Sequence, residues 1–473
     1  MNVLKEYYVG PVKITITKDE KNVCRYIIEE PQLSPYEEKA KDEVLSQILY
    51  MSSRNIEDSI IKKLREKGLK DECIEKILYH IKKQMLYDVI TPMMLDPDIE
   101  EIESSGYGNP ITVVHRLFSE CIRLYTNIVP DNDEEIIRII EKLASRANKS
   151  VNIAKPYLEF ALPEGHRVTA TISNEISLPG STFDIRKFPE KPLSITYIIS
   201  NEMLNELVAS YLWFLLEYKP FIMILGPTGS GKTTLLNALL NLVNPNYKIL
   251  TIEDTPEINI VNSNWVRFIA RSTLGGNYDV TLFDLAKLAL RYRPDFLVIG
   301  EVRGKEIEAL IHAAASGHGS LSTFHASRPI DAVTRITDLL SADLSKLFLQ
   351  TIWVFIIVGS RKEGNRNVRS ILSIYETIIE KHKIKFKKVI QWDFAKKSFI
   401  PNDISSLIKK SYRLKWIART YGFSIDEIKE ELQKRIEYLR KLINENLIDF
   451  LEVSSEIRKF YNGGDKIEVK TQS

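Results

Sequence analysis

The sequence predicts an α/β protein built on a largely parallel sheet with crossover helices, and two observations lead to this prediction. Helix-forming and strand-forming runs alternate from residue 200 to residue 324, as they do where crossover helices join parallel strands. Among them, residues 226–233 read GPTGSGKT, between the apolar run 221–225 and the helix-forming run 234–243. A loop of this composition between a strand and a helix is typical of phosphate binding.

Residues 1–95 are expected to form a hairpin and helical accessory region. Apolar and polar residues alternate on both sides of a charged turn, which predicts a hairpin over 12–28. A capping box at Ser34 and Glu37, with Pro35 at the first helical position, begins a run of amphipathic helices. These helices are expected over 34–51, 55–67 and 71–88.

Residues 96–188 are expected to form an N-terminal α+β domain, because short alternating runs are separated by turn residues. One helix is expected over 133–146. Strands are expected over 110–116, 121–126, 158–162, 166–172 and 181–188. Pro189 and Pro192 then bound a stiff segment, which predicts a linker over 189–199.

Residues 200–360 are expected to form the α/β core and residues 361–473 a further region of basic strands and C-terminal helices. In the core, strands are expected over 221–225, 248–252, 296–299 and 321–324, and helices over 200–218, 233–243, 281–292 and 306–316. Beyond it, basic strands are expected over 361–400 and about three helices over 405–461.

Composition narrows the class of protein. The 473 residues carry 65 lysines and arginines against 63 acidic residues, and this balance argues against a protein that grips nucleic acid through a global positive field. The three cysteines are far apart, so we expect reduced thiols and no zinc site. The sequence contains no signal-peptide pattern and no apolar run near the ~18 residues of a membrane span. A cytoplasmic protein is expected.

The glycine-rich loop predicts the nucleotide-binding residues. Its backbone N–H groups form an anion nest at a helix N-terminus. Lys232 is expected to reach the β- and γ-phosphates of ATP, and Thr233 to bind Mg²⁺. A turn that only caps a helix is the alternative. The expected nucleotide-binding residues are Gly226, Pro227, Thr228, Gly229, Ser230, Gly231, Lys232, Thr233 and Thr234.

Two groups of carboxylates follow apolar strands, where strand ends face a bound nucleotide. The first is Glu253, Asp254 and Glu257, which we expect to hold water or metal; a solvated acidic turn is the alternative. The second is Glu301, at the end of a strand of the Walker B type that has Gly300 where an aspartate often lies. Glu301 is therefore expected to bind Mg²⁺ through water, unless it merely ends the strand.

Histidines and arginines supply further candidates. His318 and His325 lie on either side of the last core strand, and we interpret them as a γ-phosphate sensor or a link from Glu301 to a neighbouring subunit. Packed, structural histidines are the alternative. Arg167 and Arg186 precede the core and could close onto the γ-phosphate, or each could be a solvated surface residue.

Four motifs in order resemble the type II/type IV secretion ATPase superfamily. They read GPTGSGKT, TIEDxxE, VIGEVRG and GHGxxxTxHA, and in that family they are called Walker A, Asp box, Walker B and His box. Upstream, residues 99–102, 108–116, 162–168 and 183–188 are similar to the archaeal branch, which drives archaella and archaeal pili. The similarity extends from about residue 96 to the C-terminal helices and is weaker before it.

The resemblance implies a homohexameric ring whose subunits pair an N-terminal domain with a RecA-like core and hold ATP between the two. It also implies roles for single residues. Glu257 would be the water-activating base, and Glu301 the carboxylate on the Mg²⁺ side. Arg167 and Arg186 would neutralise charge. The four-cysteine zinc module of many bacterial members is absent from the sequence, as it is in the archaeal branch.

The sequence is thus interpreted as a Mg²⁺-dependent ATPase that powers type IV pilus-like assembly or secretion through a polytopic membrane platform protein. An archaellum rotary motor is the nearest alternative. A nucleic-acid translocase and a nucleotide-gated docking scaffold are the more distant ones. The lysines of residues 381–388, in a region of strong positive charge, would give peripheral contact with an anionic membrane or an acidic loop of the partner, or would be a solvated face.

Overall fold

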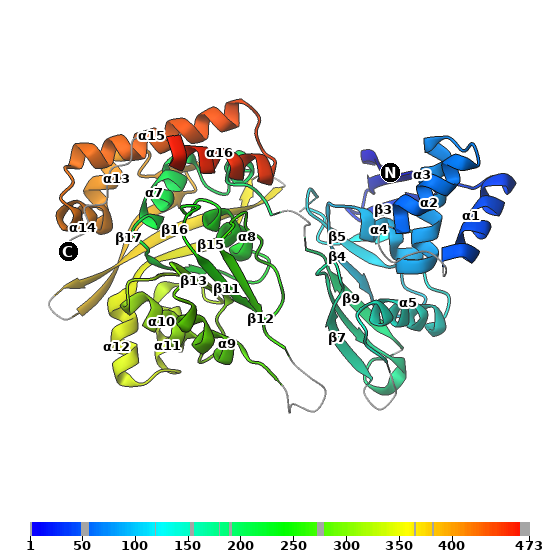
Figure 1. Ribbon diagram of the computed structural model, residues 1–473, viewed down its shortest axis with the longest axis horizontal. Helices are drawn as coiled ribbons and strands as arrows, with labels where there is room; N and C mark the ends of the chain where they lie inside the picture. Colours follow the sequence, from blue (N-terminus) through cyan, green and yellow to red (C-terminus); the bar gives the residue numbers. More distant parts are fainter. Residues whose placement is uncertain are drawn as a thin grey trace. The chain divides into compact units, whose positions relative to one another are not determined.

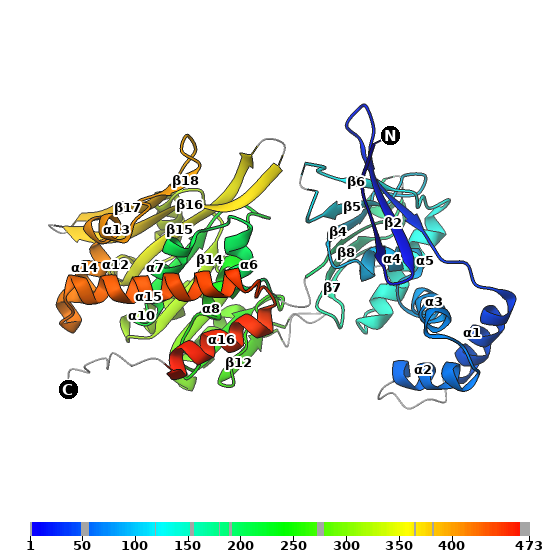
Figure 2. The same cartoon turned by 90° about the horizontal axis from the view of Figure 1, so that it is seen from above.

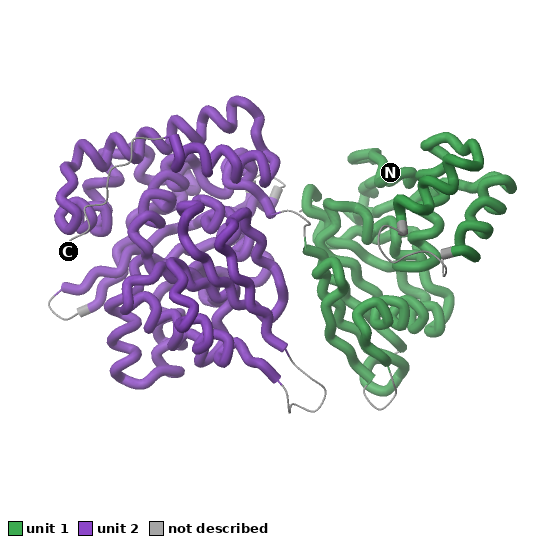
Figure 3. The backbone as a smooth tube through the Cα atoms, viewed as in Figure 1, with its two compact units in different colours: residues 1–190 green, residues 191–473 purple. Residues whose placement is uncertain are grey.

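The computed structural model describes residues 2–48, 56–118, 120–151, 156–178, 180–188, 192–271, 279–363, 366–380 and 383–463. The chain forms two compact units, residues 1–190 and residues 191–473 (Figure 3). The boundary between the two units therefore lies within the linker expected over 189–199, although residues 189–191 lie outside the described residues.

The first unit is built on one nine-stranded sheet of order β1-β2-β3-β6-β5-β4-β9-β8-β7. Only β3 and β6 pair in parallel; the other neighbours are antiparallel. The strands are β1 (Asn2–Val9), β2 (Val12–Lys18), β3 (Cys24–Glu29), β4 (Ile99–Ser104), β5 (Thr112–His115), β6 (Leu124–Thr126), β7 (Tyr157–Ala161), β8 (Arg167–Thr171) and β9 (Thr182–Arg186).

Helices of the first unit form two groups. Helix α5 (Asp133–Arg146) packs its apolar stripe onto the sheet through Ile136, Ile139 and Leu143. Helices α1 (Pro35–Ile48), α2 (Ile56–Glu66) and α3 (Asp71–Lys82) share a separate small core (Figure 2). The predicted helices are confirmed here, and a π-helical turn (Lys83–Tyr87), a 3-10 turn (Asp88–Ile90) and α4 (Thr91–Leu95) follow them.

Strands from the first 29 residues belong to the same sheet as β4 to β9, because β3 pairs with β6. This pairing differs from the separate accessory region expected for residues 1–95. A disulfide also joins Cys24 at the start of β3 to Cys121 just before β6. The expectation of reduced thiols is wrong for this pair, because the parallel pairing brings two cysteines 97 residues apart into contact. Cys73 is free.

The second unit is built on a second nine-stranded sheet, of order β12-β11-β13-β14-β10-β15-β16-β17-β18. The pairs from β12 to β15 are parallel and those from β15 to β18 antiparallel. Its strands are β10 (Phe221–Leu225), β11 (Ile249–Glu253), β12 (Trp265–Ile269), β13 (Phe296–Glu301), β14 (Gly319–Phe324), β15 (Ile352–Glu363), β16 (Arg366–Glu380), β17 (Lys383–Asp393) and β18 (Ser398–Ile400).

Helices cover both faces of this sheet, so it lies between two hydrophobic cores (Figure 1). The helices on one face are α6 (Ile195–Ser200), α7 (Glu206–Leu216), α8 (Lys232–Leu240), α13 (Ile404–Lys410), α14 (Tyr412–Tyr421), α15 (Ile425–Asn444) and α16 (Phe450–Gly463). Those on the other are α9 (Leu282–Ala289), α10 (Ile307–Ala315), α11 (Pro329–Thr337) and α12 (Ala342–Thr351). Within β10, side chains alternate between the two cores.

This architecture confirms the predicted α/β fold with a RecA-like core, an N-terminal α+β region and C-terminal helices. The finer division at residues 96, 200 and 361 stays a prediction. Among the described residues, no helix is both long enough and apolar enough to cross a membrane.

Candidate nucleotide site

The loop after β10 has the backbone that phosphate binding requires. Gly231, immediately before α8, has φ +93°, a left-handed conformation that favours glycine. A Cβ on Gly226 would lie 2.5 Å from the carbonyl oxygen of Val358 and 2.7 Å from the Ser230 hydroxyl. Glycine is needed at both positions, because Gly231 has a left-handed backbone and Gly226 lies too close to β15 for a side chain.

Lys232 is buried and turned back onto its own loop. Its Nζ donates hydrogen bonds to the carbonyl oxygens of Gly226 at 3.0 Å and Pro227 at 2.9 Å. It also lies 3.4 Å from Nδ1 of His325. Thr233 and Thr234 follow it, half-buried, in the first turn of α8. The ammonium group thus occupies the cradle in which a phosphate group would be bound.

Strands β10, β11, β13 and β14 are parallel, so their carboxyl ends lie at one edge of the sheet. Glu301, which ends β13, and His325, which follows β14, meet at this edge: the His325 Nε2 atom lies 2.7 Å from Glu301 Oε1. Arg303 donates to the other oxygen of Glu301 at 2.8 Å. Burial, and then the positive charge of Lys232, lower the pKa of His325. The structure therefore brings Lys232, Glu301 and His325 together, three of the predicted site residues.

Glu253 ends β11 and is turned into the protein, with only 3% of its surface exposed. Its Oε1 atom accepts hydrogen bonds from the backbone N–H groups of Glu257 at 2.8 Å and Ile258 at 2.6 Å. Its Oε2 atom lies 3.4 Å from Nε of Arg267. Burial raises the pKa of Glu253 to about 7, although the two backbone hydrogen bonds and Arg267 act in the opposite direction.

Glu257 is half-buried, and its main chain is fixed on both sides. Its N–H donates to Glu253, and its carbonyl oxygen accepts from the Asn237 side chain at 3.1 Å. The Asn237 oxygen in turn accepts from the N–H of Asn259 at 2.8 Å. Sequence reasoning missed Asn237; the signal available was a single amide within the apolar run of α8.

His318 is not part of this edge. It precedes Gly319 at the start of β14, whereas His325 follows the end of the same strand. Seven residues of extended chain separate the two by about 23 Å. At this opposite edge, the carbonyl oxygen of Asp295 accepts a hydrogen bond from the N–H of Gly319, the residue after His318, at 2.9 Å. Grouping the two histidines in one site was therefore wrong, because a strand places its ends at opposite edges of the sheet.

Arg167 and Arg186 lie in the first unit, directly opposite each other on β8 and β9. Arg167 is half-buried and pairs with Glu159. Arg186 is exposed, and its guanidinium lies 5.7 Å from the ring centre of Phe188. Each already has an acid beside it: Arg167 pairs with Glu159, and Glu101 of β4 lies opposite Arg186.

The donor groups at the edge fit a magnesium ion. Thr233 offers a hydroxyl and Glu301 a carboxylate at the same edge of the sheet, and Mg²⁺ prefers oxygen ligands. Glu253, the third expected ligand, instead gives one carboxylate oxygen to two backbone N–H groups.

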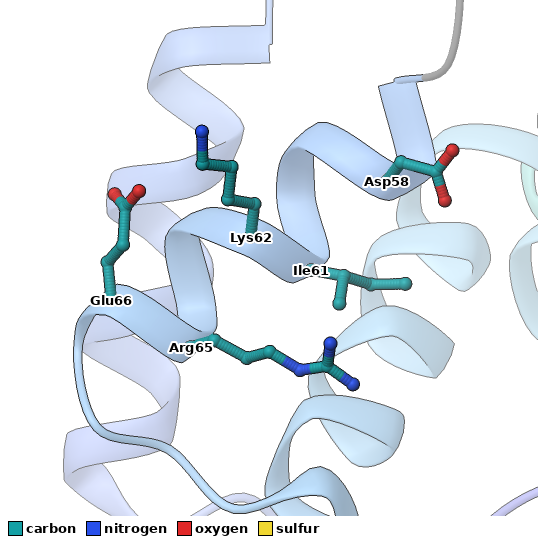
Figure 4. A pocket seen from close by; sticks show the side chains of 5 residues that line it. All are labelled: Asp58, Ile61, Lys62, Arg65 and Glu66. Atoms are coloured by element: carbon teal, nitrogen blue, oxygen red, sulfur yellow. The ribbon is translucent and has the colours of Figure 1, made fainter.

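Two other features of the described residues hold none of the predicted catalytic groups. A shallow hollow lies along α2, and Figure 4 shows charged side chains around Ile61 there.

A cluster of Asp96, Asp98 and His115 has the spacing of a metal site. The Asp96 carboxylate, however, already accepts hydrogen bonds from the hydroxyls of Tyr7 at 2.6 Å and Tyr26 at 2.8 Å. This cluster is a satisfied hydrogen-bond network.

Comparison with known proteins identifies the family. The model of the family described as type II/IV secretion system protein matches residues 123–357. Protein MJ0900 of Methanocaldococcus jannaschii is 31% identical, over 97% of this chain and 89% of its own length. The VirB11 protein of Agrobacterium fabrum is 37% identical over 26% of this chain and 36% of its own.

A structural neighbour is the ATPase DotB of Legionella pneumophila. The two chains have 18% sequence identity and a TM-score of 0.45 over 79% of this chain and 90% of that one. The family match spans the segment that contains the phosphate loop, Glu301 and His325. The chain therefore belongs to the type II/IV secretion system protein family.

Proposed function

We propose that the protein hydrolyses ATP with Mg²⁺ to drive assembly of a type IV pilus-like filament, or secretion, through a polytopic membrane platform protein. The observation that carries this proposal is the meeting of Lys232, Glu301 and His325 at one sheet edge, beside the segment of Glu257. Phosphoryl transfer depends mostly on positioning and charge stabilisation, and this edge offers both.

Each residue has a distinct part in the proposed reaction. Lys232 binds the β- and γ-phosphates, so its contacts with ATP replace its hydrogen bonds to the carbonyls of Gly226 and Pro227. Glu257 accepts the proton of the attacking water. Thr233 and Glu301 would hold Mg²⁺, which supplies neutralising charge to the phosphates when bound. His325 orients Glu301 and senses the position of Lys232.

The proposal includes a homohexameric ring in which Arg167 and Arg186 supply charge to the γ-phosphate. Their cross-strand pairing on β8 and β9, which brings two arginines to one part of the sheet, supports this role. Nucleic acid is not a proposed partner, because the net charge of +2 gives no global positive field. We further propose that the protein works at the cytoplasmic side of the membrane in a pilus-type system. Its similarity to a protein of Methanocaldococcus jannaschii supports the archaeal branch of the family.

The experiment separates nucleotide binding from hydrolysis. Lys232→Ala should weaken ATP binding, measured with a fluorescent ATP analogue, because the phosphate clamp is lost. Glu257→Gln should bind ATP with unchanged affinity while kcat falls by roughly two to four powers of ten. Glu430→Ala, an exposed acid on α15, is the control for purification and folding. Wild-type turnover by Glu257→Gln would remove Glu257 from the role of base.

A further inference from the structure

Gly300 lies at the position of β13 where Walker B strands often have an aspartate, and a neighbouring side chain fills the space above it. A Cβ built on Gly300 would lie 3.2 Å from Cγ of Glu253 and 3.7 Å from its Oε1. The two residues are neighbours because β11 pairs with β13, with Ile252 opposite Ile299. The Glu253 side chain from the adjacent strand therefore lies in tight contact with position 300, and a Cβ there would require it to shift by a few tenths of an ångström.

The Glu253 carboxylate holds a segment of backbone. Its Oε1 atom is the acceptor for two consecutive N–H groups, those of Glu257 and Ile258. Two backbone donors share this one buried oxygen, and donors left unpaired inside a protein are costly. The turn of residues 254–258 is thereby fastened to the end of β11, and Glu257 is the first residue fastened.

We propose that Glu253 is a positioning residue for Glu257, and that Gly300 is glycine because it must leave room for the Glu253 side chain. The proposal rests on the proposed role of Glu257 as the base. It assigns Glu253 to the backbone of the Asp-box turn instead of to Mg²⁺. One of its oxygens accepts two N–H groups, and the other faces Arg267.

A double-mutant cycle tests the pairing. Glu253→Ala should lower kcat about 100-fold, the scale of a misplaced catalytic group, with the affinity for ATP changed less than about 3-fold. Gly300→Ala should also lower kcat, because its Cβ displaces Glu253. The double variant should be no worse than Glu253→Ala alone, because the added methyl then meets no side chain. If the kcat losses of the two single variants multiplied in the double variant, the proposed contact between Gly300 and Glu253 would be overturned.

Glu253→Gln separates positioning from metal binding. An amide oxygen still accepts from both N–H groups, so kcat should stay within about 5-fold of wild type. The affinity for ADP should depend on Mg²⁺ concentration as in wild type. A variant with a shifted Mg²⁺ dependence would show that the Glu253 charge itself holds the ion, which would overturn the proposal.

A readout independent of hydrolysis completes the test. Hydrogen exchange at the amides of Glu257 and Ile258, measured without nucleotide, should quicken at least 10-fold in Glu253→Ala and stay unchanged in Glu253→Gln, Glu257→Gln and Glu430→Ala. Unchanged exchange in Glu253→Ala would overturn the positioning role. If exchange quickens while Glu257→Gln retains full activity, the role of Glu257 fails and the fastening of its turn by Glu253 stands.

Discussion

Replacing Glu376 with alanine should strongly destabilise the second unit. Glu376 lies in β16 and is completely buried. One of its oxygens accepts hydrogen bonds from the hydroxyls of Tyr211 at 2.6 Å and Ser411 at 2.5 Å. The other accepts from the backbone N–H groups of Tyr412 at 2.6 Å and Arg413 at 3.0 Å. A single carboxylate thus joins α7, β16 and the N-terminus of α14.

The expected loss follows from these four donors. At about 1 kcal/mol for each buried donor left unpaired, the change costs about 4 kcal/mol. Glu376→Gln should cost only about 1–2 kcal/mol, because its oxygen still accepts from the two backbone N–H groups. Its NH₂ group then faces the hydroxyls of Tyr211 and Ser411, which can rotate to accept.

Tryptophan fluorescence in a urea titration measures this loss selectively. The five tryptophans are Trp213, Trp265, Trp353, Trp392 and Trp416, all in the second unit. Unfolding midpoints should fall in the order wild type, Glu376→Gln, Glu376→Ala, and Glu430→Ala should match wild type. A loss below about 1 kcal/mol for Glu376→Ala would refute the reasoning, because four buried donors would then have found other partners.

Four further predictions concern the first unit, assembly and the surface. Reducing the Cys24–Cys121 disulfide should destabilise the first unit by about 4–5 kcal/mol, since the bond closes a 97-residue separation; unchanged hydrogen exchange in β1 to β3 after reduction would contradict this. Burial lowers the pKa of His166 from 6.5 to about 4, so the unfolded chain binds the extra proton between these values. Stability of the first unit should therefore be fully present above pH 6.5 and about 2 kcal/mol lower at pH 5, and His166→Gln should flatten this dependence; an unchanged slope would disprove it. Specific ATPase activity should rise with protein concentration, and Arg186→Ala should lower kcat more than ATP affinity. A protein that light scattering shows to be a monomer, yet that keeps full specific activity, would contradict the hexameric ring. Glutamine at five lysines should weaken binding to anionic vesicles in a salt-dependent way, at about 1 kcal/mol per lysine, with ATP hydrolysis unchanged; equal binding across a salt series would identify the patch as a solvated face. These lysines are Lys385, Lys387, Lys388, Lys409 and Lys410.

The five lysines of this prediction lie on β17 and α13. The sequence pointed to residues 381–388, of which Lys381 lies outside the described residues. The structure adds α13, where the pKa of Lys410 is lowered by burial and then by the charges of Lys388 and Lys387. Like charges from two elements therefore gather at one place.

Local patterns predicted most elements and the phosphate loop. The loop could be recognised because its glycines and Lys232 are needed in a fixed order, and β10 and α8 follow from simple periodicity. Strand β1 was missed because residues 2–9 read NVLKEYYV, with little alternation, and most of them are exposed. Its place in the sheet depends on neighbours that only tertiary structure supplies.

The site was predicted less completely because its geometry depends on pairings far apart in sequence. The role of Gly300 depends on the neighbouring strand β11, and the contact of His325 with Lys232 depends on β14 lying beside β10. His318 was wrongly grouped with His325, because the linear sequence does not show that the strand between them places the two histidines at opposite edges of the sheet. Asn237 shows in the sequence only as a single amide within an apolar run, and its contacts with the backbone of Glu257 and Asn259 depend on tertiary structure.

The position of β10 between β14 and β15 has a consequence for biosynthesis. Phe221 pairs with Ser320 on one side and Ile352 on the other, so the ribosome must deliver β14 before β10 has any strand partner, and β15 before it has both. Closing these long loops costs entropy that no early contact repays. The first unit, whose strands end at Arg186, can complete its sheet well before that moment. A nascent chain therefore contains the whole GPTGSGKT segment long before it has a nucleotide site, and ATP can assist only the last stage of folding.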